Sequence, residues 1–349
     1  MRCGAAVPSR RYEMPLESAP HARTLMQWPV SVDTYGRRDL ARVQATIIRI
    51  ANAIADFEPV ALLRAPDAIG LERRTLARDV ELWDIPTDDL WCRDSGPTFV
   101  RASDGVTAVA HLQFNGWGNK QTHANDALVA QRVAKRLGLP LIATGVTGEQ
   151  GGVEHDGEGT MLAHQSCWVN PNRNPGLSAE VISARLSAAL GARKMIWAPG
   201  LKGADITDYH IDSLARFVGS GRVLIQIDDQ MDRNDPYSVA AHATLEVLRL
   251  ATDAKGRKLD IVRLEEPESI RSTKKDFVSS YVNYYVCNGA VIAPQFGDSR
   301  SDGAAREVLS DIYPDREIVM LDIDAIGESA GGIHCATQQQ PAQVGTRTT

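Results

Sequence analysis

The sequence predicts an α/β protein in which one small helix-and-strand unit occurs five times. First, five amphipathic stretches follow one another along the chain, as expected for helices that pack one face on a core. Second, each stretch is followed, after a turn rich in Gly, Pro, Asp or Lys, by a short strand-like run. Third, further strand-like runs separate these pairs, which gives each helix two or three strands.

The elements are predicted from these two patterns in chain order. The amphipathic stretches predict helices at Arg37–Asp56, His123–Leu137, Ser178–Leu190, Tyr237–Ala251 and Asp302–Ile312. The runs that follow them predict strands at Val60–Leu63, Pro140–Ala143, Lys194–Ala198, Leu259–Leu264 and Glu317–Leu321. Further strands are predicted at Val80–Ile85, Thr107–Gln113, Arg222–Ile227, Tyr281–Val286 and Ala290–Pro294.

Two architectures fit this order of elements. A doubly wound parallel sheet is the usual result of alternating strands and helices. A ring of five small units around an axis, with the site at its centre, accommodates the additional strands better, so we predict the ring. Because no linker or change of composition divides the chain, residues 1–349 are predicted to form one domain with a disordered tail from about 343 to 349.

Composition narrows the possible partners and location. The chain has 38 Lys+Arg and 44 Asp+Glu and no basic stripe with interleaved aromatic residues, so no nucleic-acid partner is expected. Its five cysteines are scattered and form no C-x-x-C motif, which argues against a disulfide framework or a Cys-rich zinc site. No apolar run approaches the ~18 residues of a membrane helix, and no signal peptide is recognisable. We therefore expect no membrane association and a reducing, cytoplasmic location.

Four segments combine rigid Gly or Pro turns with reactive side chains. They are Trp91-Cys92-Arg93-Asp94-Ser95-Gly96-Pro97-Thr98, Glu149-Gln150-Gly151-Gly152 with the following Asp156-Gly157-Glu158-Gly159-Thr160, Thr207-Asp208-Tyr209-His210-Ile211-Asp212, and Gly331-Gly332-Ile333-His334-Cys335-Ala336-Thr337-Gln338-Gln339. Each follows a predicted strand. A fold of repeated units would bring such equivalent points together, so we expect a common site.

The two carboxylates in the first two segments each have a structural alternative. Asp94 could form a surface ion pair with Arg93, but its setting between Trp91 and a Gly-Pro turn favours a function. Glu149 could belong to an ordinary hairpin turn, and no phosphate-binding loop is indicated because the required glycine spacings are absent.

His210 and Asp212 point to the same side if their segment is extended. A carboxylate beside an imidazole raises its pKa and orients it, although a buried structural histidine with a satisfied partner is an equal alternative on this pair alone. A metal site built from His155 and His164 is not favoured, because the helical H-E-x-x-H arrangement is missing.

Cys335 has the sequence context of a reactive cysteine. It lies after a Gly-rich turn and before a polar Thr-Gln-Gln run, whereas structural cysteines have apolar neighbours. Cys92, beside Arg93, is the competing nucleophile, and Cys287 lies in an apolar run that is typical of a core.

Five motifs can be considered as a set. They are Trp91-x-Arg93-Asp94-x-Gly96-Pro97-Thr98, Phe114-Asn115-Gly116-Trp117-Gly118, Asn170-Pro171-Asn172-Arg173-Asn174, His210-x-Asp212 and Gly332-Ile333-His334-Cys335-x-Thr337-Gln338-Gln339. Together they resemble the motifs of the agmatine deiminases, which belong to the guanidine-modifying superfamily together with the bacterial-type peptidylarginine deiminases. The resemblance runs in order over nearly the whole chain. It implies the five-unit α/β propeller (pentein) fold with a pseudo-five-fold repeat.

The resemblance also implies roles for individual residues. Cys335 would be the nucleophile, His210 the general acid and base, and Glu149 the glutamate beside that histidine. Asp94 and Asp212 would hold the guanidinium of the substrate. Trp91 would line the substrate channel, and Trp117 would also contact the substrate.

The implied reaction is the hydrolysis of agmatine to N-carbamoylputrescine and ammonia, a step of putrescine biosynthesis, through a covalent thiouronium on cysteine. No cofactor or metal has a task in it, the partner is a small cationic guanidino compound, and a homodimer is possible. The alternatives are a deiminase of peptidyl or free arginine, an amidinotransferase, and a non-catalytic binding protein. Gln150 and Gly332, where the family commonly has Gly and Asn, depart from the motifs.

Overall fold

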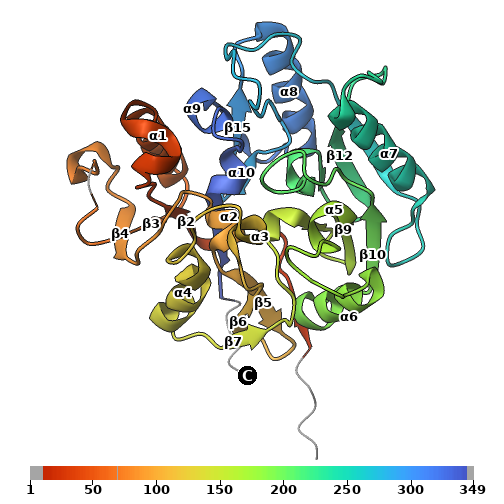
Figure 1. Ribbon diagram of the computed structural model, residues 1–349, viewed down its shortest axis with the longest axis horizontal. Helices are drawn as coiled ribbons and strands as arrows, with labels where there is room; N and C mark the ends of the chain where they lie inside the picture. The colour runs from red at the N-terminus through yellow and green to blue at the C-terminus, as the bar shows by residue number, and fades with distance from the viewer. Residues whose placement is uncertain (1–10, 69, 344–349) are drawn as a thin grey trace, which may run out of the picture.

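The computed structural model describes residues 11–68 and 70–343 and has mixed α/β content (Figure 1). The predicted α/β class is therefore confirmed. The predicted tail lies outside the described residues, except for its first position, 343.

Within residues 11–68 and 70–343 the strands form five separate sheets of three or four strands each. In the order of pairing, they are β1 (Tyr12–Glu13), β5 (Thr98–Ala102), β6 (Thr107–His111) and β7 (Leu141–Ala143); β10 (Lys194–Ala198), β9 (Thr160–His164) and β8 (Val153–His155); β11 (Ala215–Phe217), β12 (Arg222–Gln226) and β13 (Asp260–Leu264); β14 (Tyr285–Cys287), β15 (Ala290–Gln295) and β16 (Glu317–Asp322); and β17 (Thr337–Pro341), β2 (His21–Gln27), β3 (Val60–Arg64) and β4 (Val80–Asp84).

All five sheets share one topology. Each contains an antiparallel pair of strands, and the second strand of that pair is joined through a helix to a parallel third strand. Such a parallel connection needs a crossover long enough to return the chain to the same end of the sheet. The crossover helices are α4 (Val129–Leu137), α6 (Ala179–Leu190), α7 (Pro236–Leu250), α8 (Ser299–Ile312) and α1 (Val32–Ala55).

The fifth sheet combines the two ends of the described chain. β17 pairs antiparallel with β2, and β2 pairs parallel with β3. Neither β2 nor β17 was among the predicted strands. β17 has the sequence Thr-Gln-Gln-Gln-Pro, whose polar side chains give no apolar strand pattern although most of the strand is buried.

Capping residues explain where the crossover helices begin and end. Ser31, Ser178, Asp235 and Asp298 precede α1, α6, α7 and α8, and each side chain accepts a hydrogen bond from a backbone N–H of the first turn. α1 begins at Val32, before the predicted start at Arg37. A kink at Gly36, whose φ is +71°, separates the first turn of α1 from the rest of the helix, which continues from the predicted Arg37.

Two predicted boundaries were wrong by several residues. The helix expected from His123 begins as a regular helix only at Val129, after the 3₁₀ turn η2 (Asp126–Leu128). The strand expected from Tyr281 begins only at Tyr285. In each case a turn precedes the regular element.

The remaining helical segments are short. They are α2 (Cys92–Ser95), α3 (Gly116–Asn119), α5 (Gln165–Trp168), α9 (Asp324–Gly327) and α10 (Ile333–Ala336), with the 3₁₀ turns η1 (Arg73–Thr75), η3 (Gln150–Gly152) and η4 (Ile211–Ser213). Figure 1 shows α2, α3 and α10 near the middle of the molecule, with the longer helices around them. No helix in residues 11–68 and 70–343 has both the length and the apolar character needed to cross a membrane.

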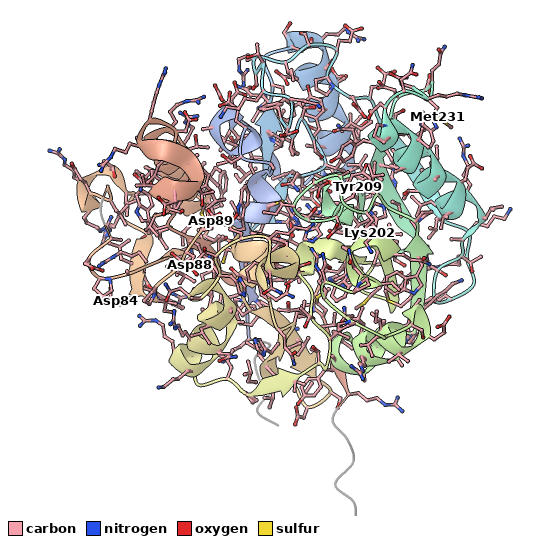
Figure 2. The ribbon with its side chains drawn as sticks, in the orientation of Figure 1. Asp84, Asp88, Asp89, Lys202, Tyr209 and Met231 are labelled. Atoms are coloured by element: carbon pink, nitrogen blue, oxygen red, sulfur yellow. The ribbon has the colours of Figure 1, made fainter. Side chains whose placement is uncertain are left out.

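The cores lie between the sheets and the crossover helices. The largest apolar cluster packs α1 against the fourth and fifth sheets and includes Trp28, Ile47 and Tyr285, all fully buried. Side chains far from the cores are more exposed, and Figure 2 shows Met231 toward the edge of the molecule while the buried Tyr209 lies closer to its middle.

We predict that Ile47→Ala lowers the free energy of unfolding by about 2–5 kcal/mol, because it removes a fully buried side chain and leaves a cavity between α1 and the sheets. Urea unfolding followed by circular dichroism measures this change. Arg38→Ala, at an exposed position of the same helix, is the control and is expected to change stability by less than about 0.5 kcal/mol. Equal effects of the two substitutions would contradict the proposed packing.

Candidate active site

Four short turns meet near the centre of the molecule and carry the predicted site residues. α2 carries Asp94, η3 follows Glu149, η4 carries Asp212 and follows His210, and α10 carries Cys335. α2 contacts η3 and α10, and η3 contacts η4. The four turns follow strands β4, β7, β10 and β16, as predicted from the repeat.

Gly151 marks the point at which three of these side chains converge. A Cβ atom at this position would lie 2.8 Å from Asp94 Oδ1, 2.9 Å from His210 Nδ1 and 3.0 Å from Asp212 Oδ2. Any side chain would therefore collide with the polar atoms of the site. Gly151 keeps this space free, and its backbone N–H donates to Asp94 Oδ1 at 3.3 Å.

Asp94 is a buried carboxylate held from two sides. Trp117 Nε1 donates to its Oδ2 at 2.9 Å, and Gly151 N–H donates to Oδ1. Burial raises its pKa to about 6, an effect that His210 opposes and that the negative charges of Asp212 and Glu149 reinforce. A cation placed beside Asp94 would favour its charged form.

Asp212 has one occupied and one free oxygen. Its Oδ2 accepts from His334 Nδ1 at 2.7 Å, while Oδ1 is buried without a hydrogen-bond partner among the described residues. Burial would raise the pKa of this carboxyl, but the hydrogen bond and charge of His334, together with the charges of His210 and Arg216, outweigh burial and lower the pKa. A buried, ionised oxygen without a partner is costly, and a ligand that donates hydrogen bonds would satisfy it.

Cys335 is half-buried, with its thiol close to polar groups. Asn283 Nδ2 donates to Sγ at 3.2 Å, and the Cys335 backbone N–H donates to Asn283 Oδ1 at 3.3 Å. Sγ also lies 3.6 Å from Asp212 Oδ2. Burial, together with the charges of Asp212 and Asp94, raises the pKa of the thiol well above its usual value. The thiol of the free protein is therefore protonated.

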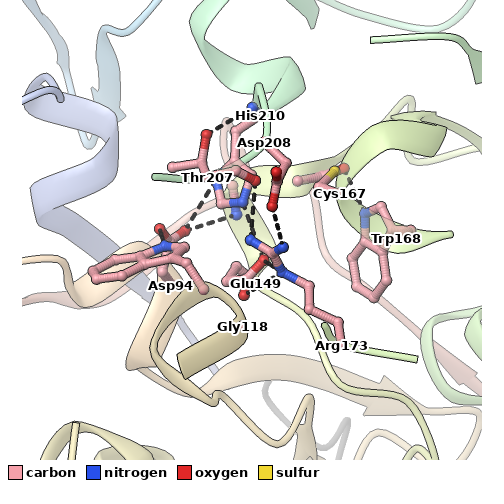
Figure 3. A network of polar contacts seen from close by, with 12 residues as sticks. Asp94, Gly118, Glu149, Cys167, Trp168, Arg173, Thr207, Asp208 and His210 are labelled. Atoms are coloured by element: carbon pink, nitrogen blue, oxygen red, sulfur yellow. Dashed lines mark hydrogen bonds and ion pairs between the residues drawn. The ribbon is translucent and has the colours of Figure 1, made fainter. Parts of the chain in front are cut away.

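Figure 3 shows His210 at the start of a chain of charged groups that continues through Glu149 and Arg173 to Asp208. His210 Nε2 lies 3.1 Å from Glu149 Oε2, and Arg173 Nε donates to both Glu149 oxygens at 2.9 Å. Arg173 Nη1 donates to Asp208 Oδ2 at 2.7 Å. Asp208 and Tyr209 both have positive φ, 62° and 67°, so the turn before His210 is a strained one that these contacts hold in place.

The charges around His210 favour its protonated form. Burial alone would lower its pKa, but Asp94, Glu149 and Asp212 outweigh burial and raise the pKa to about 9. Its Nδ1 lies 3.7 Å from Asp94 Oδ1. Because the pKa is raised above its ordinary value, these contacts stabilise the fold fully below pH ~6.5, and this stabilisation is lost as the pH rises through about 9.

The structure thus brings Cys335, His210, Asp94, Asp212 and Glu149 together. One local expectation was wrong, since His210 and Asp212 do not lie on an extended strand: residues 211–213 form the 3₁₀ turn η4. The two side chains nevertheless converge, because the turn begins immediately after the extended His210.

Trp91 and Trp117, the predicted substrate-binding tryptophans, line one pocket with Asp94 and Cys335. This pocket has a volume of about 390 Å³ and is open to the surface. Trp117 also fixes Asp94 by the hydrogen bond described above, and Trp91 packs against Gly331, where a Cβ atom would lie 2.2 Å from the indole ring. Cys92, the competing nucleophile, is fully buried in an apolar cluster and does not line the pocket.

The departures Gln150 and Gly332 have visible structural roles. Gln150 Oε1 accepts from Gln338 Nε2 at 2.9 Å, which joins η3 to β17. At Gly332 a Cβ atom would lie 2.4 Å from Asn283 Oδ1, so the absence of a side chain gives Asn283 room beside Cys335.

Three residues of the site, Asn283, Arg173 and His334, were not assigned a role from the sequence. Asn283 lies in a segment predicted as a strand, and nothing in its neighbours indicated a contact with the thiol. Arg173 was seen only as part of a motif, and its ion pair with Glu149 depends on the tertiary structure. His334 adjoins Cys335 in sequence, but its two carboxylate partners, Asp212 and Glu17, come from distant segments.

No group of three or more His, Cys, Asp or Glu side chains is arranged to hold a metal ion within residues 11–68 and 70–343. His155 and His164, considered as ligands from the sequence, have different surroundings. His164 contacts the Tyr209 carbonyl and the Thr244 hydroxyl, and His155 lines a separate cavity.

Residues 13–341 match the family model described as Porphyromonas-type peptidyl-arginine deiminase. The chain belongs to this family. Among similar proteins, the agmatine deiminase of Medicago truncatula is 35% identical over 95% of this chain and 96% of its own length, and that of Stutzerimonas stutzeri is 35% identical over 95% and 96%. The structure of agmatine deiminase from Enterococcus faecalis superimposes with a TM-score of 0.88 at 29% identity, covering 97% of this chain and 99% of that one.

We predict that the His210 imidazole titrates near pH 9 and that Glu149→Gln lowers this midpoint, because the substitution removes a negative charge 3.1 Å from Nε2. Histidine ring NMR titrations measure both values, with the His210 signal assigned from its loss in His210→Gln. His111, whose pKa burial lowers, serves as the internal control and should be unaffected. A His210 midpoint at or below pH ~6.5 in the unaltered protein would contradict the described charge balance.

Proposed function

We propose that this chain hydrolyses agmatine to N-carbamoylputrescine and ammonia through a covalent intermediate on Cys335. The observation that carries the proposal is a thiol flanked by two buried carboxylates: Cys335 lines one open pocket with Asp94, and its Sγ lies 3.6 Å from Asp212 Oδ2. Asp212 Oδ1 has no partner among the described residues and needs a donor. Family membership and the agmatine deiminases among the relatives support the same reaction.

A guanidinium group fits the space between these carboxylates. It is planar and permanently charged, and it presents several N–H donors in a fixed fork. Asp212 Oδ1 and the Asp94 carboxylate would accept from different N–H groups, and each charge-assisted hydrogen bond contributes about 1.5–3 kcal/mol. Together they would fix the guanidinium carbon near Sγ of Cys335.

Binding of this cation would also activate the nucleophile. The free thiol is protonated because burial and the charges of Asp212 and Asp94 raise its pKa. A bound guanidinium neutralises these two charges, which lowers the pKa of the thiol and favours the thiolate that attacks. The site therefore needs its substrate before Cys335 becomes reactive.

His210 is placed to move the protons. As an imidazolium, with a pKa of about 9, it would protonate the amine that leaves as ammonia, which produces the thiouronium intermediate. The neutral imidazole would then accept a proton from the attacking water, and the C–S bond would break to release the carbamoyl product. Glu149, fixed by Arg173, would hold the ring and stabilise its charged form.

The charged residues that line the pocket favour agmatine over free arginine. The carboxylates of Asp39, Asp89 and Glu328 line it, and Lys274 is the single basic residue among the described lining residues. Lys274 Nζ already contacts Asp39 at 3.2 Å and Glu328 at 3.5 Å. A negative lining suits the ammonium of agmatine, whereas the carboxylate of free arginine would have no arginine partner in the described lining.

A deiminase of peptidyl arginine is the second candidate, because the matching family model carries that description. A peptide would have to pass the same acidic lining without a terminal ammonium to compensate it. An amidinotransferase would require an acceptor amine in place of water. A non-catalytic role would leave the free oxygen of Asp212 and the arrangement around Cys335 without a purpose.

The same proposal includes the finer architecture and the location. We propose that the five sheets of common topology are the five units of an α/β propeller with pseudo-five-fold symmetry and form one domain. The colours of Figure 1, which pass around the molecule in chain order, support this arrangement.

The proposed location is a reducing compartment such as the cytoplasm, where a reactive thiol stays reduced. Cys92, Cys167, Cys287 and Cys335 are unpaired, as expected there. The homodimer stays a prediction.

Ammonia release from agmatine, arginine and an arginyl peptide in parallel tests the function, with Cys335→Ala as the blank. We expect release from agmatine, and none from the variant because it lacks the nucleophile. Release mainly from arginine or the peptide would keep the chemistry and overturn the substrate. No release from any of the three would refute the proposed reaction.

We predict that Asp94→Asn and Asp212→Asn each lower kcat/KM for agmatine by at least about 10- to 100-fold, with changes in both kcat and KM. Each substitution removes the charge from one charge-assisted hydrogen bond of about 1.5–3 kcal/mol. Steady-state kinetics measure the effect. Asp84→Asn, at the exposed end of β4, is the matched control and should be nearly unchanged. Wild-type kinetics in either site variant would remove that residue from the site.

A further inference from the structure

A second, smaller cavity, with a volume of about 40 Å³, is separate from the substrate pocket. His334, the residue directly before Cys335, lines it together with Glu17, Arg93, Glu154 and Arg216. The side chain of Cys335 instead lines the substrate pocket. The two neighbouring residues of α10 thus face different spaces, and His334 connects the charged groups of the second cavity with Asp212.

His334 lies between two carboxylates. Its Nδ1 is 2.7 Å from Asp212 Oδ2, and its Nε2 is 2.9 Å from Glu17 Oε2. A neutral imidazole carries one N–H, so it can donate to only one of these oxygens and would present a lone pair to the other. Both distances are those of hydrogen bonds to charged acceptors, and both are satisfied only if each ring nitrogen carries a proton.

Glu17 is firmly held as an anion. Arg93 and Arg216 contact its Oε2 at 3.1 and 3.0 Å, and the backbone N–H of Val286 donates to Oε1 at 2.8 Å. Burial would raise its pKa, but Arg216, His334 and Arg93 outweigh burial and lower the pKa well below its usual value. Glu17 therefore presents a permanent negative charge to Nε2 of His334.

The backbone of His334 is fixed as well. Its N–H donates to the Asn283 carbonyl at 3.1 Å, and its carbonyl accepts from Arg93 Nε at 3.3 Å. The backbone contacts fix the Cα position, and the two ring contacts fix the side chain, so the ring has little freedom to turn away from either carboxylate. Its orientation determines which oxygen of Asp212 is occupied.

We propose that Glu17 and His334 form a positioning pair in which a doubly protonated His334 holds Asp212 ionised and leaves its Oδ1 free for a guanidinium. The inference rests on the proposed function, because it assigns the device to the substrate-binding carboxylate. The protonated ring of His334 also places a fixed positive charge next to Asp212. This charge offsets the repulsion between the Asp212 carboxylate and the thiolate of Cys335. Neither Glu17 nor His334 would touch the reacting atoms.

Several charged groups face His334 from other elements. The anionic ones are Asp212 on η4, Glu17 before β2 and Glu154 on β8; the cationic ones are Arg93 on α2 and Arg216 on β11; and the thiol of Cys335 follows on α10. Glu154 contacts Arg216 at 3.2 Å and, within the described structure, forms no hydrogen bond with His334, which makes it a suitable control.

Neutron diffraction on crystals of the unaltered protein at pH 8 tests the protonation of His334 directly. We expect deuterons on both Nδ1 and Nε2. A deuteron on only one nitrogen would overturn the proposal. This measurement needs neither turnover nor a variant, so it remains valid if agmatine is not the substrate.

Binding of agmatine to Cys335→Ala, measured by calorimetry from pH 4 to 8.5, tests the consequence for Asp212. Adding His334→Gln removes the positive charge but keeps a hydrogen-bond donor. Because Asp212 then protonates more easily, we expect a further loss of affinity, of about tenfold at the lowest pH, beyond the loss that protonation of Asp94 causes around its pKa of about 6 in both proteins. The difference between the two proteins should disappear as the pH rises. Adding Glu154→Gln instead should leave the profile in place.

The alternative outcomes are distinct. An equal loss of affinity at every pH in the His334→Gln background would indicate a merely structural role and would overturn the proposal, as would an unchanged profile. Failure of Cys335→Ala itself to bind agmatine at any pH would refute the proposed function, while the diffraction result would still decide the state of His334.

Discussion

The arrangement of the site depends on balancing buried negative charge. Asp94, Glu149, Asp212 and Glu17 are carboxylates removed from water at the centre of one molecule, and each such ion costs several kcal/mol unless it is paired. Arg173 and His210 compensate Glu149, while His334 and two arginines compensate Glu17 and one side of Asp212. Asp94 and the free oxygen of Asp212 remain undercompensated beside the thiol. The position where the balance is incomplete is also the position where a cationic ligand would bind.

This balance explains why the reactive residues come from different sheets. No single β-β-α-β unit could bury so many charges, because it has too little surface to surround them. Each turn contributes one or two groups, and neighbouring turns supply the opposite charge or the hydrogen-bond donor. Glycines permit the close approach: Gly151 leaves room for three side chains and Gly332 leaves room for Asn283. The site is consequently a property of the assembled chain rather than of one segment.

The sequence was sufficient to predict the elements whose pattern is local. The five crossover helices and the strands after them show clear amphipathic or apolar patterns, and the reactive residues lie in glycine-rich turns after strands. What could not be predicted depends on pairing between distant segments. β17 is a run of polar residues that becomes a strand only because β2 lies beside it. Glu17 and Asn283 acquire their roles from Arg93, His334 and Cys335, which are far away in sequence.

The pairing of β2 with β17 has a consequence for when the site is assembled. β2 lies near the start of the described chain and its antiparallel partner is the last described strand, so one edge of β2 stays open until these two distant segments meet. α10, which carries Cys335, directly precedes β17. The nucleophile thus joins its partners only once β2 and β17 have paired, and reactivity is tied to the folding of nearly the whole described chain.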